Sequence, residues 1–537
     1  GTQIGAEIFP QVDAGQFQFR LKAPTGTRIE QTEAITQESL RFIGDEVRAA
    51  GGEIAISAGY VGVVPSSYPI NTIFLWMGGP EEAVIRVALK KGPVRVEELK
   101  AKLREKLPDH LRRWVAAKWK REGEAADEVD RRAAELQVAF EPADIVNEVM
   151  SFGSPSPIEV AISGPKVADN RVHAEKIFRE LSKVPGIVDL RYVQALDYPT
   201  VEIAVDREKA GASNVTAEEV ARAVTPFTSS SRFTVPNYWR DPASGVGYQV
   251  QVEVPFSLVT SPSDLELAPV RKGLEPLLVR DVGRIRSGTM PGEIDRYNMR
   301  RLVSMTGNIQ GSDLGAVAGQ VARAIEAVGP PPPGVRVDVR GQVAPLNELF
   351  RGLGIGLAIA VVVIALLLLA YFQSIRLALV AVTPIPAVLA GVAAILLATG
   401  TTLNLQSFMG AIMAVGVATA NAILLVVFAE RARMEGSAAG EAGAVGAKTR
   451  ARPILMTSCA MIAGMIPMAL GLGQGGDESA PLARAVIGGL AAATATTLLV
   501  LPAAFALVMD GAGSHSASLD PFDPASRHHV PEVPHAP

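Results

Sequence analysis

The chain divides into two parts by its pattern of hydrophobic and polar positions. Residues 1–345 carry Lys, Arg, Asp and Glu throughout, whereas residues 352–429 contain one charged residue, Arg376. An uncharged block of that length is too apolar for a soluble domain and fits the interior of a lipid bilayer. The pattern therefore predicts a polar globular part followed by a membrane part.

Five segments of the second part are long and apolar enough to cross a bilayer as helices. They are residues 352–371, 377–399, 405–429, 453–472 and 485–509, each with about 20 mainly apolar positions. The third segment has a small residue at every fourth position: Gly410, Ala414, Ala418 and Ala422. Such a stripe predicts a central helix packed closely against another helix.

The loops between these segments predict the orientation. The loop 372–376 and the loop 430–452 carry Arg or Lys, whereas the loops 400–404 and 471–481 carry neither. The positive-inside rule therefore puts the two basic loops in the cytoplasm, residues 1–345 in the periplasm and the tail after Asp510 in the cytoplasm. A large outside part without a preceding helix also predicts a missing upstream helix in a longer chain.

The first 345 residues alternate strand and helix patterns. Strands are predicted at 17–23, 54–60, 71–79, 158–164, 201–206, 300–310 and 335–341, and helices at 27–50, 96–136, 171–183 and 313–328. Thr27 with Glu30, and Thr216 with Glu219, have the spacing of a capping box at a helix start. This order predicts α+β units of the split βαβ, ferredoxin-like kind, with residues 201–299 inserted into the second unit.

Composition excludes several functions. The net charge of −4 and the pI near 6.0 give no reason to expect a nucleic-acid partner. The single cysteine, Cys459, permits no disulfide framework. Outside the tail the histidines are His110 and His173, and no nucleophile–base, phosphate-binding or dinucleotide motif accompanies them. We therefore expect no enzyme activity, no cofactor and no metal centre.

Several long motifs resemble one family. They are DYPTVEIAVDREKAGASNVTAEEVARAV, GNIQGSDLG, NLQSFMGAIMAVGVATANAILLVVFAE, RARPILMTSCAMIAGMIPMALGLG and PLARAVIGGL. In their order along the chain they resemble the carboxy-terminal half of resistance–nodulation–division (RND) efflux transporters, over residues 7–509. The family's amino-terminal half is absent from this sequence.

The resemblance implies a domain plan. Residues 1–157 resemble the first porter subdomain of this half, 158–200 and 300–345 the second, and 201–299 the docking subdomain. Residues 346–510 would form the transmembrane bundle of five helices, and 511–537 a disordered cytoplasmic tail. The family implies a homotrimer in the bacterial inner membrane that works with a periplasmic adaptor (membrane fusion) protein and an outer-membrane channel, driven by proton antiport.

The resemblance also implies coupling residues. The family's relay has an Arg and a Thr that fall on Arg450 and Thr457, but its Lys falls on Ala420. Without that cation, either Arg450 becomes the main positive charge or proton coupling is altered or lost. Thr419 and Asn421 would then be neutral hydrogen-bond partners, although ordinary interhelical bonds explain them as well, and Arg450 can equally be a positive-inside anchor.

Substrate is the least determined property. A hydrophobic or amphiphilic compound is favoured, with Phe152, Phe74, Trp76 and Tyr60 as candidates for an apolar path. A heavy-metal exporter of the same family is the alternative, but the methionines of the first part, Met77, Met150, Met290, Met299 and Met305, show no close pair. His528, His529 and His535 lie in a Pro-rich tail that is more typical of disorder than of a metal site.

Three functional hypotheses therefore remain open. The chain is half of a proton-driven exporter of hydrophobic or amphiphilic compounds, or an RND-like protein with altered or lost proton coupling, or a relative that holds a partner or lipid without transporting it.

Overall fold

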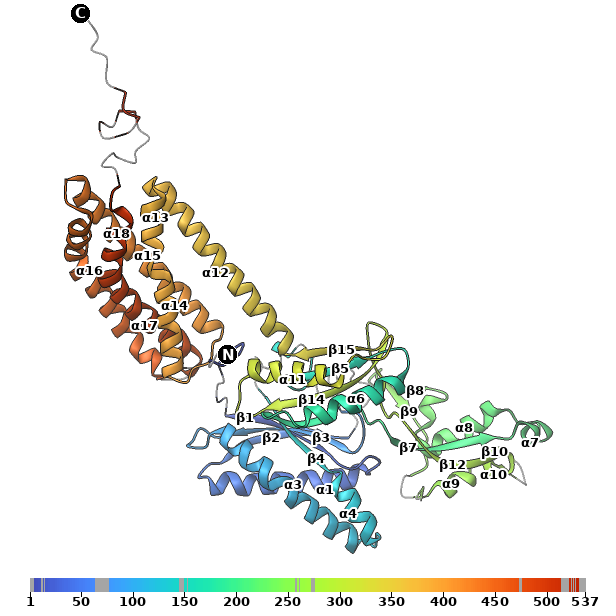
Figure 1. Cartoon of the computed structure of the whole chain (residues 1–537). Coiled ribbons are helices and arrows are strands. Elements are labelled where there is room, and N and C mark those ends of the chain that lie inside the picture. Colours follow the sequence, from blue (N-terminus) through green and yellow to red (C-terminus); the bar gives the residue numbers. More distant parts are fainter. Residues whose placement is uncertain are drawn as a thin grey trace, which may run out of the picture.

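The structure is a computed structural model with an α/β part and a helical bundle at opposite ends (Figure 1). It describes all residues except 1–3, 11–12, 14, 63–76, 144–148, 152, 256–257, 260, 272–275, 473–475, 513–520, 523, 525, 527 and 531–537. The predicted fold class, α+β units followed by five apolar helices, is confirmed.

The first α/β unit has the order βαββαβ, with two successive helices, α3 and α4, in its second helical connection. Its strands are β1 (Gln16–Lys22), β2 (Ile54–Val61), β3 (Glu82–Leu89) and β4 (Gln137–Glu141), and its helices are α1 (Ile29–Ala49), α3 (Val96–Arg121) and α4 (Ala126–Ala134). The strands pair in the order β2–β3–β1–β4, all antiparallel. The inward side chains of β1, including Phe17 and Phe19, meet the apolar faces of the helices in one buried core. This is the ferredoxin-like arrangement that the sequence predicts.

The second α/β unit repeats this order around an insertion. It contains β5 (Ile158–Ser163), α6 (Val167–Leu181), β6 (Ile187–Tyr192), β13 (Asp295–Tyr297), β14 (Arg300–Ile309), α11 (Leu314–Val328) and β15 (Arg336–Gly341). β14 pairs with β5, β6 and β13, and β15 pairs with the other edge of β5. Helices α6 and α11 cover one face of this sheet and enclose a second core that includes Val160, Ile177 and Val317.

The insertion has a small core of its own. Its long ribbon pairs β7 (Tyr198–Val205) with β12 (Gly283–Met290), and a hairpin pairs β8 (Asn237–Arg240) with β9 (Gly247–Val250). Between them lie α7 (Arg207–Ala212), α8 (Ala217–Thr228), η1 (Ser231–Phe233), α9 (Pro262–Glu266), β10 (Pro269–Arg271), β11 (Leu277–Leu278) and α10 (Val279–Val282). The predicted capping box of α8 is confirmed, because Thr216 accepts from the amide of Glu219 while Glu219 accepts from the amide of Thr216.

The bundle contains the five predicted membrane-length segments. They are α12 (Val343–Phe372), α13 (Ile375–Val382) with α14 (Pro384–Ala398), α15 (Leu405–Met434), α16 (Ala439–Ala469), and α17 (Gly476–Ala495) with the π-helix η3 (Thr496–Val500) and α18 (Leu501–Met509). α12 runs from the second unit to the far end of the bundle, where α13 begins (Figure 1). The far end is therefore the end that the loop charges predict to be cytoplasmic.

The small-residue stripe of α15 packs as predicted. A Cβ added to Gly410 would stand 2.5 Å from the carbonyl oxygen of Leu482 on α17, and one added to Gly489 would stand 2.5 Å from the Cβ of Ala414. Ala414, Ala418 and Ala422 are fully buried. Because no larger side chain fits at these contacts, α15 is a central helix held backbone to backbone against α17.

The amino-terminal segment joins the two parts. Ala6 forms a parallel bridge with Leu403 in the loop between α14 and α15, and its amide donates to the carboxylate of Asp313 at the start of α11 over 2.8 Å. The segment therefore links the second unit to the bundle.

Some predicted elements differ from the structure. The capping box at Thr27 is wrong: its hydroxyl donates to the carbonyl of Pro24 over 2.6 Å, and α1 begins two residues later. The helix predicted over 96–136 breaks at Gly123, whose φ of +95° ends α3. The predicted spans are also too short, because helices α12, α16 and α17 continue into polar sequence that hydropathy does not detect. Residues 71–76 of the predicted strand 71–79 lie outside the described residues.

Candidate functional site

Arg450 is an arginine on α16 without an acidic partner in the described part of the chain. Its guanidinium carbon lies 5.4 Å from the ring centroid of Phe428 on α15. Its Nε is buried and has no hydrogen-bond partner among the described residues. A buried donor left unpaired costs about 1–3 kcal/mol. The Nε–H is therefore available to a carboxylate or a water that approaches this side of α15 and α16.

The other coupling candidates do not form a network with Arg450. Thr419 is buried, and its hydroxyl donates to the carbonyl of Val415 in its own helix over 2.8 Å. Asn421 is half-buried, and its amide makes no hydrogen bond to any described residue. Thr457 and Ala420 are exposed, and the Thr457 hydroxyl bonds back to its own helix. Their coupling role therefore stays a prediction, with Asn421 the candidate whose amide is free among the described residues.

Sequence reasoning missed three hydroxyl side chains of the bundle. Thr494 on α17 donates to Ser458 on α16 over 2.7 Å, and Thr497 has a buried hydroxyl without a partner among the described residues. Thr497 lies in the π-helix η3, a form that often occurs at functional sites. The one available signal was the three threonines at positions 494, 496 and 497 in an otherwise apolar segment.

The structure describes only some of the residues that were candidates for a substrate path or a metal site. Phe152, Phe74 and Trp76 lie outside the described residues, and Tyr60 is exposed on β2. Met305 is buried in the second core, whereas Met290 and Met299 are exposed. Among the described residues, no three or more His, Cys, Asp or Glu side chains are grouped so that they could hold a metal ion.

A cavity of about 460 Å³ lies on the second unit, beside the first turns of α12. Its wall is partly apolar, with Val193 and Leu302, and partly charged, with Glu159 and Arg340. The guanidinium of Arg340 lies 4.0 Å from the ring centroid of Tyr297, which also lines the cavity. The volume suits a small organic molecule. The Tyr297 ring and the Arg340 guanidinium suit an amphiphile, because they offer one apolar and one charged contact.

Burial raises the pKa of two carboxyl groups at or near this cavity. Burial raises the pKa of Glu159, whose carboxylate accepts a hydrogen bond from Ser304 over 2.8 Å. Burial first, and then the charges of Asp295 and Glu82, raise the pKa of Glu293 to about 7. Glu293 lies against the first unit, since a Cβ added to Gly78 would stand 2.8 Å from its Oε2. Its charge therefore changes near neutral pH.

We expect Glu293 to make stability depend on pH. The folded protein keeps a proton on Glu293 that the unfolded chain, with a carboxyl pKa near about 4.3, has already released. The stabilisation of the folded protein by this bound proton is therefore lost as pH rises from about 4 to 7. In Glu293→Gln the free energy of unfolding should depend less steeply on pH than in wild type, when unfolding by urea is followed at several pH values. Glu326→Gln, at an exposed carboxyl on α11, is the control, and equal slopes in all three proteins would contradict the expectation.

The sequence matches a known family over more than half of its length. The pattern of the AcrB/AcrD/AcrF family matches residues 115–509, from α3 to the end of α18. The match therefore covers both the α/β part and the whole bundle.

Curated relatives of the chain carry different names. The chain is 29% identical over 376 residues to "Cobalt-zinc-cadmium resistance protein CzcA" of Cupriavidus metallidurans, covering 67% of this chain and 34% of that protein. It is 30% identical over 371 residues to "Nickel-cobalt-cadmium resistance protein NccA" of Alcaligenes xylosoxydans xylosoxydans, covering 68% and 34%. It is 26% identical over 308 residues to "Swarming motility protein SwrC" of Bacillus subtilis, covering 57% and 29%.

A solved structure has the same fold. The crystal structure of a heavy metal efflux pump (crystal form II) matches with a TM-score of 0.75 and 24% identity, over 94% of this chain and 49% of that one. The chain thus spans about a third of the length of these curated relatives and about half of the solved pump. From the family match and the shared fold, the chain belongs to the AcrB/AcrD/AcrF family of RND transporters.

Proposed function

We propose that the chain is the carboxy-terminal half of an RND exporter that moves hydrophobic or amphiphilic compounds out of the cell. The observation that carries the substrate class is the cavity of about 460 Å³, whose wall combines apolar side chains with the Arg340–Tyr297 stack. Such a wall binds an apolar body and orients a polar or charged end.

The proposal includes the membrane setting. The bundle would lie in the inner membrane of a bacterium, with residues 1–345 in the periplasm and the tail in the cytoplasm. The basic residues Arg376, Lys448 and Arg452 support this orientation. We further propose that the assembly is a homotrimer that passes its substrate to an adaptor protein and an outer-membrane channel, as the family resemblance implies.

Coupling to protons is proposed to depend on Arg450. Ala420 offers no charge, whereas Arg450 is a cation with a buried Nε–H that is unpaired among the described residues. A carboxylate approaching it would form a charge-assisted bond when ionised and release the guanidinium when protonated. Altered or lost proton coupling remains the competing proposal, favoured by the absence of any hydrogen bond between Arg450 and the other candidates among the described residues.

Export of a divalent metal ion is the second candidate substrate. The names of two relatives and of the solved heavy metal efflux pump support it. The charges of Asp295 and Glu82 act on Glu293, but among the described residues these carboxylates do not form a group of three that could hold a metal ion. The buried cations Arg20 and Arg191 nearby oppose it.

Export assays with the complete transporter separate the two candidates. In a bacterium lacking its own pumps, we expect the transporter to lower the accumulation of ethidium, with no gain in tolerance to Zn²⁺, Co²⁺ or Cd²⁺. Tyr297→Ala and Arg340→Ala should each reduce ethidium export severalfold at equal expression, while Arg336→Ala, an exposed arginine of the same strand β15, should not. Metal tolerance that is lost in Glu293→Gln, with no ethidium export, would favour the metal candidate.

A further inference from the structure

The hydroxyl of Thr497 differs from those of other threonines in the bundle. Threonines in a membrane helix commonly donate to the carbonyl four residues earlier, which satisfies the hydroxyl within its own helix. Those that do so here are Thr383, Thr399, Thr419, Thr449, Thr457 and Thr494. Thr497 is 1% exposed, and its hydroxyl has no hydrogen-bond partner among the described residues. It is therefore a buried oxygen that the described part of the chain leaves unsatisfied.

The main-chain carbonyl of Thr497 also lacks its helical donor. Thr497 lies in the π-helix η3, where the amide of Leu501 donates to the carbonyl of Thr496, five residues back. The same pattern would pair the Thr497 carbonyl with the amide of residue 502, but Pro502 has no N–H. Thr497 therefore presents two oxygens, the hydroxyl and the carbonyl, that the π pattern does not satisfy.

Prolines interrupt a second helix of the bundle between α13 and α14. The amide of Thr383 turns back to the carbonyl of Val380 over 3.1 Å, a step of three residues. In an α-helix the carbonyl of Val382 would accept from the amide of residue 386, but Pro386 has no N–H. This break leaves another main-chain oxygen without its helical donor.

The two interruptions lie at the same depth in the bundle. Val382 packs against two buried clusters, one with Ala493 and the other with Leu501. Thr497 lies between these two residues along the helix, four positions from each. The π-helix η3 itself packs against α14, α15 and α16. The unpaired oxygens of the two interrupted helices are therefore brought to one level inside the bundle.

Helix direction makes this level favourable for a positive charge. α13 begins at the far end of the bundle, where α12 ends (Figure 1). α17 begins near the opposite end, since Arg484 in its first half donates to Thr401 in the loop between α14 and α15 over 2.7 Å. Both helices therefore reach this depth with their carboxyl-terminal turns, where the helix dipole is negative.

Further hydroxyl oxygens lie one helical turn away. Thr494, three residues before Thr497, is its neighbour on the helix surface. Its hydroxyl is hydrogen-bonded to that of Ser458 on α16 over 2.7 Å, and Ser458 is 2% exposed. The oxygens at this level are thus neutral hydroxyls and carbonyls, and acceptors outnumber the donors available to them. A cation satisfies such a set better than a water, which must also place its own protons.

We propose that the oxygens around Thr497 bind a sodium ion inside the bundle. The ligands are the hydroxyl and carbonyl of Thr497 and the carbonyl of Val382, with water completing the shell. Interrupted membrane helices supply ligands of this kind to Na⁺. A bound ion would hold the α13–α14 break against η3, so Na⁺ becomes a candidate for the coupling that Ala420 leaves open. The site depends neither on the proposed substrate nor on Arg450.

Binding of radioactive Na⁺ to the purified complete transporter tests the site without any substrate. Choline would replace Na⁺ at constant ionic strength, because choline is too large to be enclosed by these oxygens. We expect saturable binding that unlabelled Na⁺ displaces and choline does not. Thr497→Val removes the hydroxyl and keeps the shape of the side chain, so it should weaken binding at this site at least about tenfold. Thr497→Ser keeps the hydroxyl and should bind Na⁺ as wild type does.

Pro502→Ala tests the carbonyl ligand. Alanine restores an amide at position 502 that can donate to the carbonyl of Thr497, so Na⁺ should be bound more weakly in this variant as well. This variant decides the result if Thr497→Val does not fold. Thr496→Val is the matched control, because it makes the same substitution one residue earlier in η3, and its Na⁺ binding should equal that of wild type.

The unfolding temperature distinguishes an ion ligand from a structural hydroxyl. Without Na⁺, Thr497→Val should be at least as stable as wild type, because it removes a buried hydroxyl that has no partner among the described residues. Added Na⁺ should stabilise wild type and Thr496→Val but not Thr497→Val. A water at this place would give no displaceable Na⁺ binding. That result, or equal Na⁺ binding by wild type, Thr497→Val and Pro502→Ala, would overturn the proposal.

Discussion

Replacing Arg450 with alanine is expected to reduce export by the complete transporter to the level of cells without it, while expression and assembly remain unchanged. Arg450 has no acidic partner among the described residues, and its Nε–H is buried and unpaired there. Since Ala420 cannot supply the cation that the family resemblance implies there, Arg450→Ala would leave no cation at either of the proposed coupling positions. Export can be measured as the rate of ethidium loss from preloaded cells, at equal membrane levels of both proteins.

The neighbouring Arg452 provides the matched control. It lies two positions along the same helix and is exposed, so Arg452→Ala removes one positive charge from the same part of α16 without touching the contact with Phe428. Arg452→Ala should export normally, and Arg450→Ala combined with Ala420→Lys should recover part of the activity. Full export by Arg450→Ala would mean that this arginine is a positive-inside anchor and that the bundle is coupled in another way.

The fold was predictable because its signals are local. The apolar spans are visible as runs without charge, and the stripe at Gly410, Ala414, Ala418 and Ala422 states directly which face of α15 another helix approaches. The alternation of apolar and polar residues in β1 is a local signal of a strand in the same way. Where local signals were ambiguous, the prediction failed. Thr27 and Glu30 have the spacing of a capping box, but the Thr27 hydroxyl donates to the carbonyl of Pro24 and does not cap α1.

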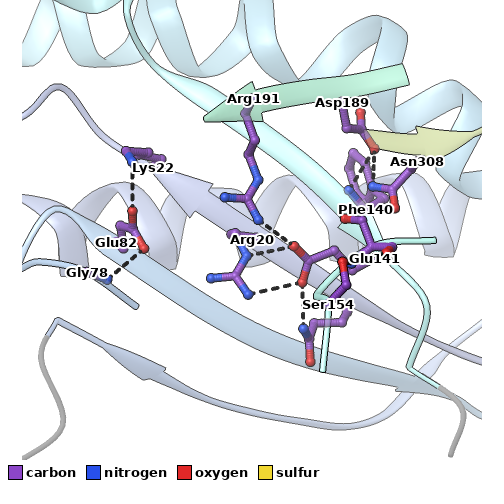
Figure 2. Close-up of polar contacts among 12 residues, drawn as sticks. Arg20, Lys22, Gly78, Glu82, Phe140, Glu141, Ser154, Asp189, Arg191 and Asn308 are labelled. Atoms are coloured by element: carbon purple, nitrogen blue, oxygen red, sulfur yellow. Dashed lines mark hydrogen bonds and ion pairs between the residues drawn. The ribbon is translucent and has the colours of Figure 1, made fainter. Parts of the chain in front are cut away.

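The contacts of Glu141 with Arg20 and Arg191, which join the first and second α/β units (Figure 2), could not be predicted because these residues are far apart in sequence. Glu141, Arg20 and Arg191 come from three strands of two units, and each reads in sequence as an ordinary surface charge. Only the pairing of β1 with β4, and the packing of β6 against them, brings the three together. The cavity is similar, since Tyr297 and Arg340 meet through separate strands of the second sheet. Sequence spacing carries no information on such contacts.

The candidate coupling residues were only partly predictable from the sequence. Arg450, Thr457 and Ala420 were found by their place in long motifs, whereas their physical roles depend on what surrounds them. The structure supplies part of that environment: Thr419 bonds to its own helix, so it offers no free hydroxyl, and Asn421 has a free amide among the described residues. Asn421 is therefore a better candidate partner for an ion or a water than Thr419.

Disrupting the β8–β9 hairpin is expected to break the proposed trimer. Trp239 and Tyr248 are direct cross-strand partners with ring centroids 6.0 Å apart, yet both are about half exposed, and Tyr238 beside them is 70% exposed. An isolated two-stranded hairpin is marginally stable in water. Exposed aromatic side chains on such a hairpin are typical of residues that dominate a protein–protein interface. The hairpin is therefore the strongest candidate for a contact with another subunit.

Trp239→Ser combined with Tyr248→Ser should convert the trimer to smaller species. Truncating an interface hot spot costs about 2 kcal/mol or more, so each substitution should weaken association by roughly 30-fold or more. Native mass spectrometry and light scattering in detergent measure the assembly directly. Met299→Ser is the control, because Met299 is a 90% exposed apolar residue between β13 and β14 of the second unit and is not part of the hairpin. If the double variant remains a trimer at the same concentration as wild type, the hairpin is not the interface, and its exposed aromatic residues must bind a different partner.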